Sequence, residues 1–199
     1  TALAGRLTTT RYAYDGNDNL TTLTYPTGLV VTSTHDANNN LIAVNGFGGS
    51  VSGCTYNLAR LPTACTLGNG KSTQSTYTSR YFPKRVTTAG VFATAGVLDL
   101  GYAYDARGNI TTLTNYLDST KTQTLTYDVL DRLLTFRGAW GSGSTAYDTV
   151  GNRTRKTIGT RSTTYTYSNN RLSALSGSAP ESYAYYGDGT VRTRTKGGV

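Results

Sequence analysis

The chain has 199 residues, a formal net charge of +8 and a hydrophobic content of 37%, with 23 glycines and 16 tyrosines. It contains no run of about 18 apolar residues that could span a bilayer, and it does not start with a charged and then apolar leader. Neither a transmembrane helix nor a signal peptide is therefore expected in this segment. The positive charge by itself favours solubility and weak affinity for polyanions.

Two stretches, residues 12–24 and 102–114, predict the same β-hairpin. In each, aromatic and β-branched residues suited to a half-buried strand lead to a tyrosine and an aspartate, Tyr14-Asp15 and Tyr104-Asp105. The aspartate side chain can accept hydrogen bonds from N–H groups about two residues further on, and Gly108 can adopt φ > 0 without steric cost. The aspartate is thus expected to close the turn, and the glycine lets the chain bend.

Weaker copies of this pattern recur along the whole chain. Each starts from a Tyr or His anchor, and the anchors stand at positions 14, 35, 56, 77, 104, 127, 147, 167 and 185. A hairpin of about 20 residues cannot bury an apolar face alone and needs neighbours on both sides. The sequence therefore predicts an all-β fold, a single array of about nine consecutive antiparallel hairpins over residues 1–199. The further structural anchors of this array are His35, Asp36, Tyr127, Asp128, Tyr147, Asp148 and Gly151.

Cys54 and Cys65 flank a short turn symmetrically, so they are expected to face each other across one hairpin. This arrangement permits a disulfide in an oxidising compartment, and a pair of small buried thiols is the alternative in a reducing one. No metal site is expected, because no nearby His or further Cys completes a tetrahedron.

Two places are expected to depart from regular hairpins. From Thr87 to Leu98 the spacing lengthens, which predicts an insertion or irregular loop. Residues 140–144, with the sequence Trp-Gly-Ser-Gly-Ser, predict a flexible connection between hairpins.

Basic residues gather late in the chain. Residues two apart on a strand share a face, so alternate basic residues on two late strands are expected to form rows that together could make a polyanion patch. Nucleic-acid binding is not expected, because the tyrosines that could stack on bases are needed for packing between hairpins. The residues of this patch are Arg153, Arg155, Lys156, Arg192, Arg194 and Lys196.

The sequence offers little for catalysis. His35 is the only histidine, and it stands in the slot that tyrosine fills in other repeats, with Asn39 in place of the glycine. Glu181 is the only glutamate, and most anchor aspartates are expected to be engaged in turns. We therefore predict no enzyme and no cofactor. Three sequons occupy the same place in the repeat, so the hairpin consensus explains them without glycosylation; they begin at Asn19, Asn109 and Asn152.

The pattern Tyr-x-Tyr-Asp-x-x-Gly-Asn-Ile/Leu, clearest in residues 102–110 and 12–20, resembles the YD repeat of the RHS (rearrangement hot-spot) family. This family includes bacterial RHS toxins, the C components of Tc toxins, wall-associated proteins and teneurins, and the resemblance covers essentially the whole chain. It implies a curved or spiralling sheet that is part of a hollow shell. In bacterial members such a shell encloses a toxic C-terminal polypeptide until delivery.

The resemblance implies a non-enzymatic wall segment whose partners are the rest of the parent shell and an enclosed cargo polypeptide. The family's Asp-Pro self-cleavage motif is missing, since no proline here follows an aspartate. Because the chain starts without Met and ends without a polar capping unit, we expect a fragment of a longer protein. The resemblance implies that this protein is secreted or on the bacterial cell surface. The alternative is a cell-surface adhesion module that binds glycans or protein receptors through exposed strands.

Overall fold

The computed structural model describes residues 8–46, 50–90 and 96–197, and these residues form an antiparallel β-sheet of eighteen strands. The strands follow one another in sequence, and each hairpin partner is the next strand in the chain. The one described helical turn is η1 (Ser119–Lys121). The prediction of an all-β array of consecutive antiparallel hairpins is confirmed.

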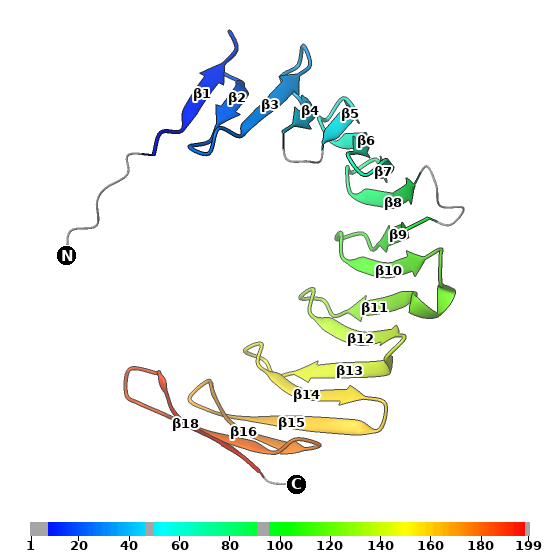
Figure 1. The fold of residues 1–199 in the computed structure, drawn as a ribbon. Helices are drawn as coiled ribbons and strands as arrows, with labels where there is room; N and C mark the ends of the chain where they lie inside the picture. Colours follow the sequence, from blue (N-terminus) through cyan, green and yellow to red (C-terminus); the bar gives the residue numbers. More distant parts are fainter. Residues whose placement is uncertain (1–7, 47–49, 91–95, 198–199) are drawn as a thin grey trace, which may run out of the picture. The chain divides into compact units, whose positions relative to one another are not determined.

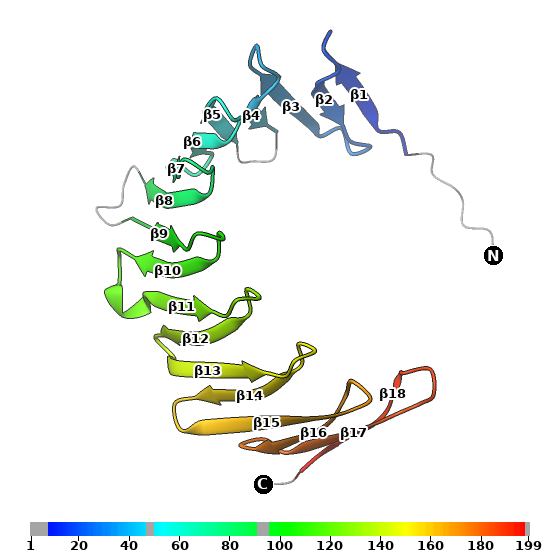
Figure 2. The same cartoon turned by 180° about the vertical axis from the view of Figure 1, so that it is seen from behind.

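The chain divides into two compact units, Thr1–Gly101 and Tyr102–Val199, and β9 (Leu98–Tyr104) crosses the division. In the first unit each strand lies beside the next in both views of the ribbon (Figures 1 and 2). Its other strands are β1 (Arg11–Tyr14), β2 (Leu20–Thr24), β3 (Val30–His35), β4 (Leu41–Asn45), β5 (Val51–Tyr56), β6 (Pro62–Leu67), β7 (Lys71–Tyr77) and β8 (Pro83–Gly90).

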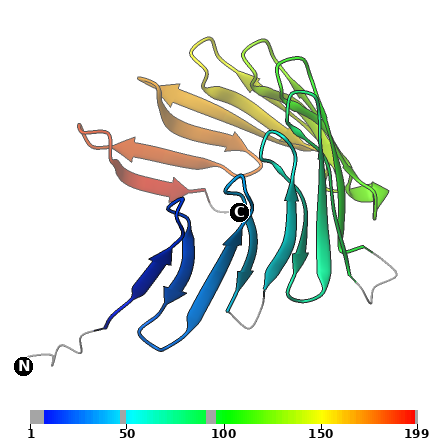
Figure 3. The same cartoon turned by 90° about the horizontal axis from the view of Figure 1, so that it is seen from above.

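The second unit repeats the arrangement, and Figure 3 shows its hairpins lying next to one another in chain order. The loop between β10 and β11 contains η1. The strands that follow β9 are β10 (Ile110–Asn115), β11 (Gln123–Tyr127), β12 (Leu133–Gly138), β13 (Gly141–Tyr147), β14 (Arg153–Ile158), β15 (Arg161–Ser168), β16 (Arg171–Gly177), β17 (Glu181–Tyr185) and β18 (Val191–Lys196).

A β-bulge recurs beside the anchor residue of the described hairpins. In the first hairpin Ala13 pairs with Thr22 and Tyr14 pairs with Leu20, so Thr21 is the extra residue on the second strand. The same shift stands at His35, Tyr127 and Tyr185, among others. On the bulged strand, the two residues that flank the extra residue lie on opposite faces of the sheet. A strict alternation of side chains would place them on the same face.

Burial is slight on both faces of the sheet. Among the described residues only Val31, Cys54 and Gly101 are buried, and no large side chain is fully enclosed. The described residues of each unit form no second layer on either face, so stability comes from contacts between neighbouring strands and hairpins.

One local prediction is wrong, and another lies partly outside the described residues. Residues 141–144 are the start of β13 rather than a flexible connection, because Gly141 pairs with Gly138 and continues the ladder of β12. Thr87 to Gly90 belong to β8, whereas residues 91–95 lie outside the described residues. The chain ends, residues 1–7 and 198–199, also lie outside them.

Candidate functional site along the Asp loops

The loops that follow the anchor residues all lie along one edge of each unit, because every second connection of an antiparallel array returns to the same edge. We call them the Asp loops. In the loop after β9, Oδ1 of Asp105 accepts the backbone N–H groups of Arg107, Gly108 and Asn109 at 2.9, 2.8 and 2.9 Å. Oδ2 of Asp105 accepts the Asn109 side-chain amide at 3.1 Å. The aspartate thus satisfies four donors of its own loop.

The same geometry recurs in other Asp loops. Asp15, Asp36, Asp128 and Asp148 each accept the N–H groups two and four residues further on. Asn57 does so in the loop after β5. The aspartate side chains are thus committed to holding their loops, which leaves their carboxylates little freedom for acid–base chemistry.

The residue just before the end of each loop adopts a left-handed conformation. It is glycine at Gly108, Gly151 and Gly189, where no Cβ opposes φ near +95°. Asp18, Asn39 and Asp131 occupy the same position with φ near +60°, which short polar side chains tolerate. Two larger residues are also forced into it, Arg60 at φ 60° and Tyr81 at φ 63°.

Replacing Arg60 with glycine is expected to stabilise the protein by about 0.5–1 kcal/mol, since relief of left-handed strain exceeds the extra entropy that glycine gains on unfolding. Tyr81→Gly is expected to act in the same direction. Gly108→Ala, as the control, should destabilise. Denaturant midpoints of the three variants measure the effect, and a lower midpoint for Arg60→Gly would contradict it.

The anchor tyrosines join each hairpin to the one before it. The Tyr127 hydroxyl donates to the Ile110 carbonyl at 3.0 Å, and Tyr167 donates to the Arg153 carbonyl at 3.0 Å. In each case the acceptor is the residue that follows the preceding Asp loop. The same bond joins Tyr56 to Leu41, Tyr77 to Pro62 and Tyr185 to Leu172.

Two anchors differ from this rule. His35 stands at the end of β3 in the tyrosine slot, and its buried Nδ1 has no hydrogen-bond partner among the described residues. Tyr147 instead lies under the Arg132 guanidinium at 4.6 Å, and the Thr145 hydroxyl donates to the Leu133 carbonyl in its place.

Cys54 and Cys65 lie opposite each other in the β5–β6 hairpin, and their sulfur atoms are bonded at 2.10 Å. A bulge at Gly53, with φ 58°, aligns them: Ser52 pairs with Thr66 and Thr55 pairs with Ala64. Of the two states that the sequence leaves open, the structure contains the disulfide. Among the described residues no group of three or more His, Cys, Asp or Glu side chains could hold a metal ion.

The prediction that Arg153 and Arg155 share a face is wrong. The bulge at Thr154 pairs Arg153 with Tyr147 and Arg155 with Ala146. The Arg153 guanidinium lies 4.4 Å from the ring centre of Tyr165 and donates to its hydroxyl, whereas Arg155 pairs with Thr164 on the other face. Strands β15, β16 and β17 separate these residues from the basic residues of β18, so the two rows are not neighbours.

On β18, Arg194 is engaged in an ion pair. Its guanidinium donates to both carboxylate oxygens of Glu181 at 2.9 and 2.8 Å, and the Tyr183 hydroxyl also donates to this carboxylate. The bonds from Arg194 and then Tyr183 lower the pKa of Glu181 to about 2. Lys196 pairs with Glu181 across the strands, and Arg192 lies 6.0 Å from the ring centre of Tyr186.

Stability is expected to fall as the pH is lowered from about 4.5 to about 2, with part of this fall due to Glu181. The pKa of this carboxyl is lower in the folded protein, so the unfolded chain binds more protons in this window and stability rises with pH. Denaturant midpoints of the wild type and Glu181→Gln between pH 5 and pH 2 test this. The variant should give the flatter curve, and parallel curves would contradict the prediction.

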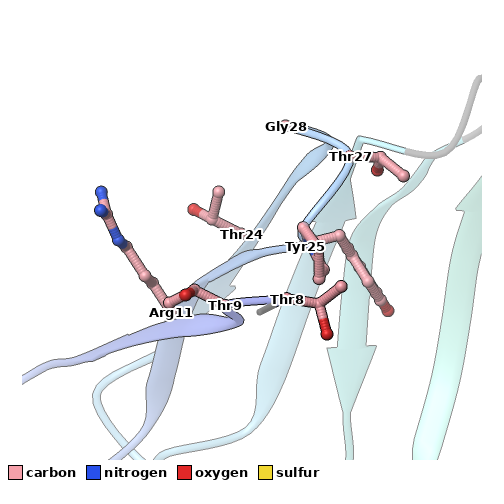
Figure 4. A pocket seen from close by; sticks show the side chains of 8 residues that line it. Thr8, Thr9, Arg11, Thr24, Tyr25, Thr27 and Gly28 are labelled. Atoms are coloured by element: carbon pink, nitrogen blue, oxygen red, sulfur yellow. The ribbon is translucent and has the colours of Figure 1, made fainter. Parts of the chain in front are cut away.

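Open hollows lie along the strands. One of about 470 Å³ is beside β1 and β2. In Figure 4 the Arg11 guanidinium and the Tyr25 hydroxyl point away from each other, so the polar groups of this hollow do not converge on a ligand. It is lined by Thr8, Thr9, Arg11, Thr24, Tyr25, Pro26, Thr27 and Gly28. Within the described ranges, no helix is long and apolar enough to cross a membrane.

The three sequon asparagines all use their side-chain amides within the Asp-loop edge. Asn109 donates to Oδ2 of Asp105 at 3.1 Å and to Oδ1 of Asp131 at 2.7 Å. Asn19 and Asn152 make the corresponding pairs of bonds. These bonds to the next loop were not predicted from the sequence, although the recurrence of Asn four residues after Asp was visible there.

A comparison with family models matches residues 14–51 to the model described as RHS Repeat. A search of curated proteins finds no match. These residues include the first two anchors, Tyr14 and His35, and the Asp loops that follow them.

Solved structures show the same fold along nearly the whole chain. The chain is similar to one in the Photorhabdus luminescens Tc holotoxin pore, with a TM-score of 0.70 and 18% identity over 94% of this chain and 12% of that chain. It is also similar to TcdB2-TccC3 without its hypervariable C-terminal region, with a TM-score of 0.71 and 17% identity over 97% of this chain and 14% of that one. Residues 14–51 thus match the RHS Repeat model, and nearly the whole chain shares the fold of these Tc toxin chains.

Proposed function

We propose that the chain is a structural wall segment of a larger RHS shell, which encloses and protects a cargo polypeptide until delivery. The observation that carries this proposal is the similarity to Tc toxin chains over 94% and 97% of the chain. The chain spans only 12% and 14% of the length of those proteins. The proposal therefore treats residues 1–199 as a single hairpin array within a longer protein, whose remaining wall and cargo are its partners.

The organisation of the sheet supports a wall rather than an enzyme. The described anchor aspartates are occupied by hydrogen bonds within their own loops, and the hollows beside the strands are open. The proposed segment thus has no catalytic role and needs no cofactor. Within each unit the described neighbouring strands pair with each other, which suits a continuous barrier.

The disulfide between Cys54 and Cys65 supports a location outside the reducing cytosol. We therefore propose that the parent protein is secreted. Binding of glycans or receptors through exposed strands is the competing role, and the experiment below separates it from enclosure.

Limited proteolysis of the full-length parent protein, with mass spectrometry of the fragments, tests enclosure. If the repeats surround a cargo, a polypeptide outside the repeats should resist protease under native conditions and be digested after denaturation. A cargo-deleted form, as the control, should show the same cleavage sites in the repeats. Digestion of all non-repeat sequence under native conditions would overturn enclosure, and a glycan and receptor screen would follow.

A further inference from the structure

Neighbouring Asp loops are joined by side-chain hydrogen bonds, and the residue that closes a loop makes two kinds of them. The residue two after the aspartate can also reach the next loop: Asn17 donates to Oδ1 of Asn39 at 3.2 Å, and Arg107 donates to Oδ1 of Asp131 at 3.4 Å. In the first kind, the asparagine that closes one loop donates its amide to the left-handed residue of the next loop. Asn109 donates to Oδ1 of Asp131 at 2.7 Å. The other described cases are Asn19 to Asn39 at 2.9 Å and Asn152 to Asn170 at 3.3 Å. In all of them the left-handed residue carries a side-chain oxygen.

In the second kind, arginine closes the loop. Arg132 donates to the Asp148 carbonyl in the next loop at 3.2 Å, and its guanidinium lies over the ring of Tyr147. Arg171 likewise donates to the Tyr186 carbonyl at 3.3 Å and lies 5.8 Å from the ring centre of Tyr185. In both cases the left-handed residue of the next loop is glycine, at positions 151 and 189.

Sterics explain why arginine is followed by glycine in the last of these loops. A Cβ on Gly189 would lie 3.0 Å from Nη2 and 3.3 Å from Cζ of Arg171. The guanidinium thus lies close to where a side chain at position 189 would start. A Cβ on Gly151 would meet no atom within 4 Å, so this steric contact applies to Arg171 with Gly189 and not to Arg132 with Gly151. An asparagine at position 171 would be too short to fill the space beside Gly189. Its amide would also need a side-chain acceptor at position 189, which glycine does not supply.

Asn40 shows what happens when neither combination is present. The next loop has Arg60 at its left-handed position, which offers no acceptor. The Asn40 amide donates to Oδ2 of Asp36 in its own loop at 2.9 Å, and no bond to the next loop is found among the described residues.

We infer that the Asp-loop edge carries a pairing rule that specifies which hairpin fits after which. A closing Asn fits a following loop with a side-chain acceptor at its left-handed position, and a closing Arg fits a following loop with glycine there. The edge is therefore an interaction surface between hairpins whose preferred partner can be read from two residues. The rule is independent of whether the sheet encloses a cargo.

A double-mutant cycle at Arg171 and Gly189 tests the rule. In the wild type, Gly189→Asn should accelerate hydrogen exchange at the amides of Tyr186 and Gly189 by roughly fivefold, the equivalent of one hydrogen bond, because the new side chain displaces Arg171. In the Arg171→Asn background the same change should slow exchange, because it supplies an acceptor for the new amide. The sign of the effect thus reverses between the backgrounds.

Gly187→Asn is the matched control, because it makes the same change in the same loop, where an added Cβ meets no atom within 4 Å. It should act equally in both backgrounds. A second cycle, Arg132→Asn with Gly151→Asn, is independent of sterics, because a Cβ at position 151 would meet no atom within 4 Å. There the acceptor that Gly151→Asn supplies should slow exchange in the Arg132→Asn background relative to the effect of the same change beside Arg132. Equal effects of Gly189→Asn in the two backgrounds, or no coupling in the second cycle when only that one is readable, would overturn the rule.

Discussion

Replacing Tyr127 with alanine is expected to lower the free energy of unfolding of its part of the array by about 3 kcal/mol. Its ring is half-buried between strands, and its hydroxyl bridges to the Ile110 carbonyl of the preceding hairpin at 3.0 Å. The variant loses both the aromatic packing and the bond between hairpins. Repeat arrays can unfold in parts, so native-state hydrogen exchange of β10 to β12 is the appropriate measurement.

Two further variants separate these contributions. Tyr127→Phe keeps the ring and is expected to cost about 1 kcal/mol, the usual value for one hydrogen bond. Tyr14→Ala is the positional control, because Tyr14 fills the same slot in the first described hairpin but is 59% exposed. It should have a much smaller effect than Tyr127→Ala. Equal effects of the two alanine variants would contradict a role in joining hairpins.

Removal of the disulfide by the double change Cys54→Ala and Cys65→Ala is expected to cost about 3 kcal/mol under oxidising conditions. The cross-link closes a short loop, with a sequence separation of 11, and so restricts the unfolded chain more than the folded hairpin. Denaturant unfolding with and without a reductant measures this effect, with exchange in β5 and β6 as the local probe.

With reductant present, the wild type should approach the stability of the double variant, whereas the variant itself should not respond. Alkylation of denatured, unreduced protein should leave its mass unchanged. Labelling of both cysteines before reduction would show that the thiols are free, which is the alternative that the sequence leaves open.

The turns are the part of this fold that the sequence predicts best. Asp105 and Gly108 carry their conformational preferences in their own side chains, and an aspartate followed by glycine at fixed spacing describes a local structure completely. The left-handed conformation of Asn39 follows for the same reason. Repetition of this local pattern was enough to predict the consecutive hairpins and the family resemblance.

Features that depend on two strands were harder to predict. The bulge beside each anchor shifts the face of the second strand, and this is why Arg153 and Arg155 lie on opposite faces despite their spacing. A signal was present: apolar residues in the second strands are three apart, as in Leu20 with Leu23 and Ile110 with Leu113, where a regular strand predicts even spacing. The bonds between loops depend on a residue about 20 positions away, so no local pattern identifies them.

The contacts between Asp loops constrain how the gene for such an array can change length. In-frame loss of the hairpin containing the loop at 148–152 would place Arg132 before Asn170, a mismatched pair. Loss of this hairpin together with the next would place Arg132 before Gly189, which restores a matched pair. In this part of the chain, deletions that remove two hairpins at once should therefore be tolerated better than deletions that remove one.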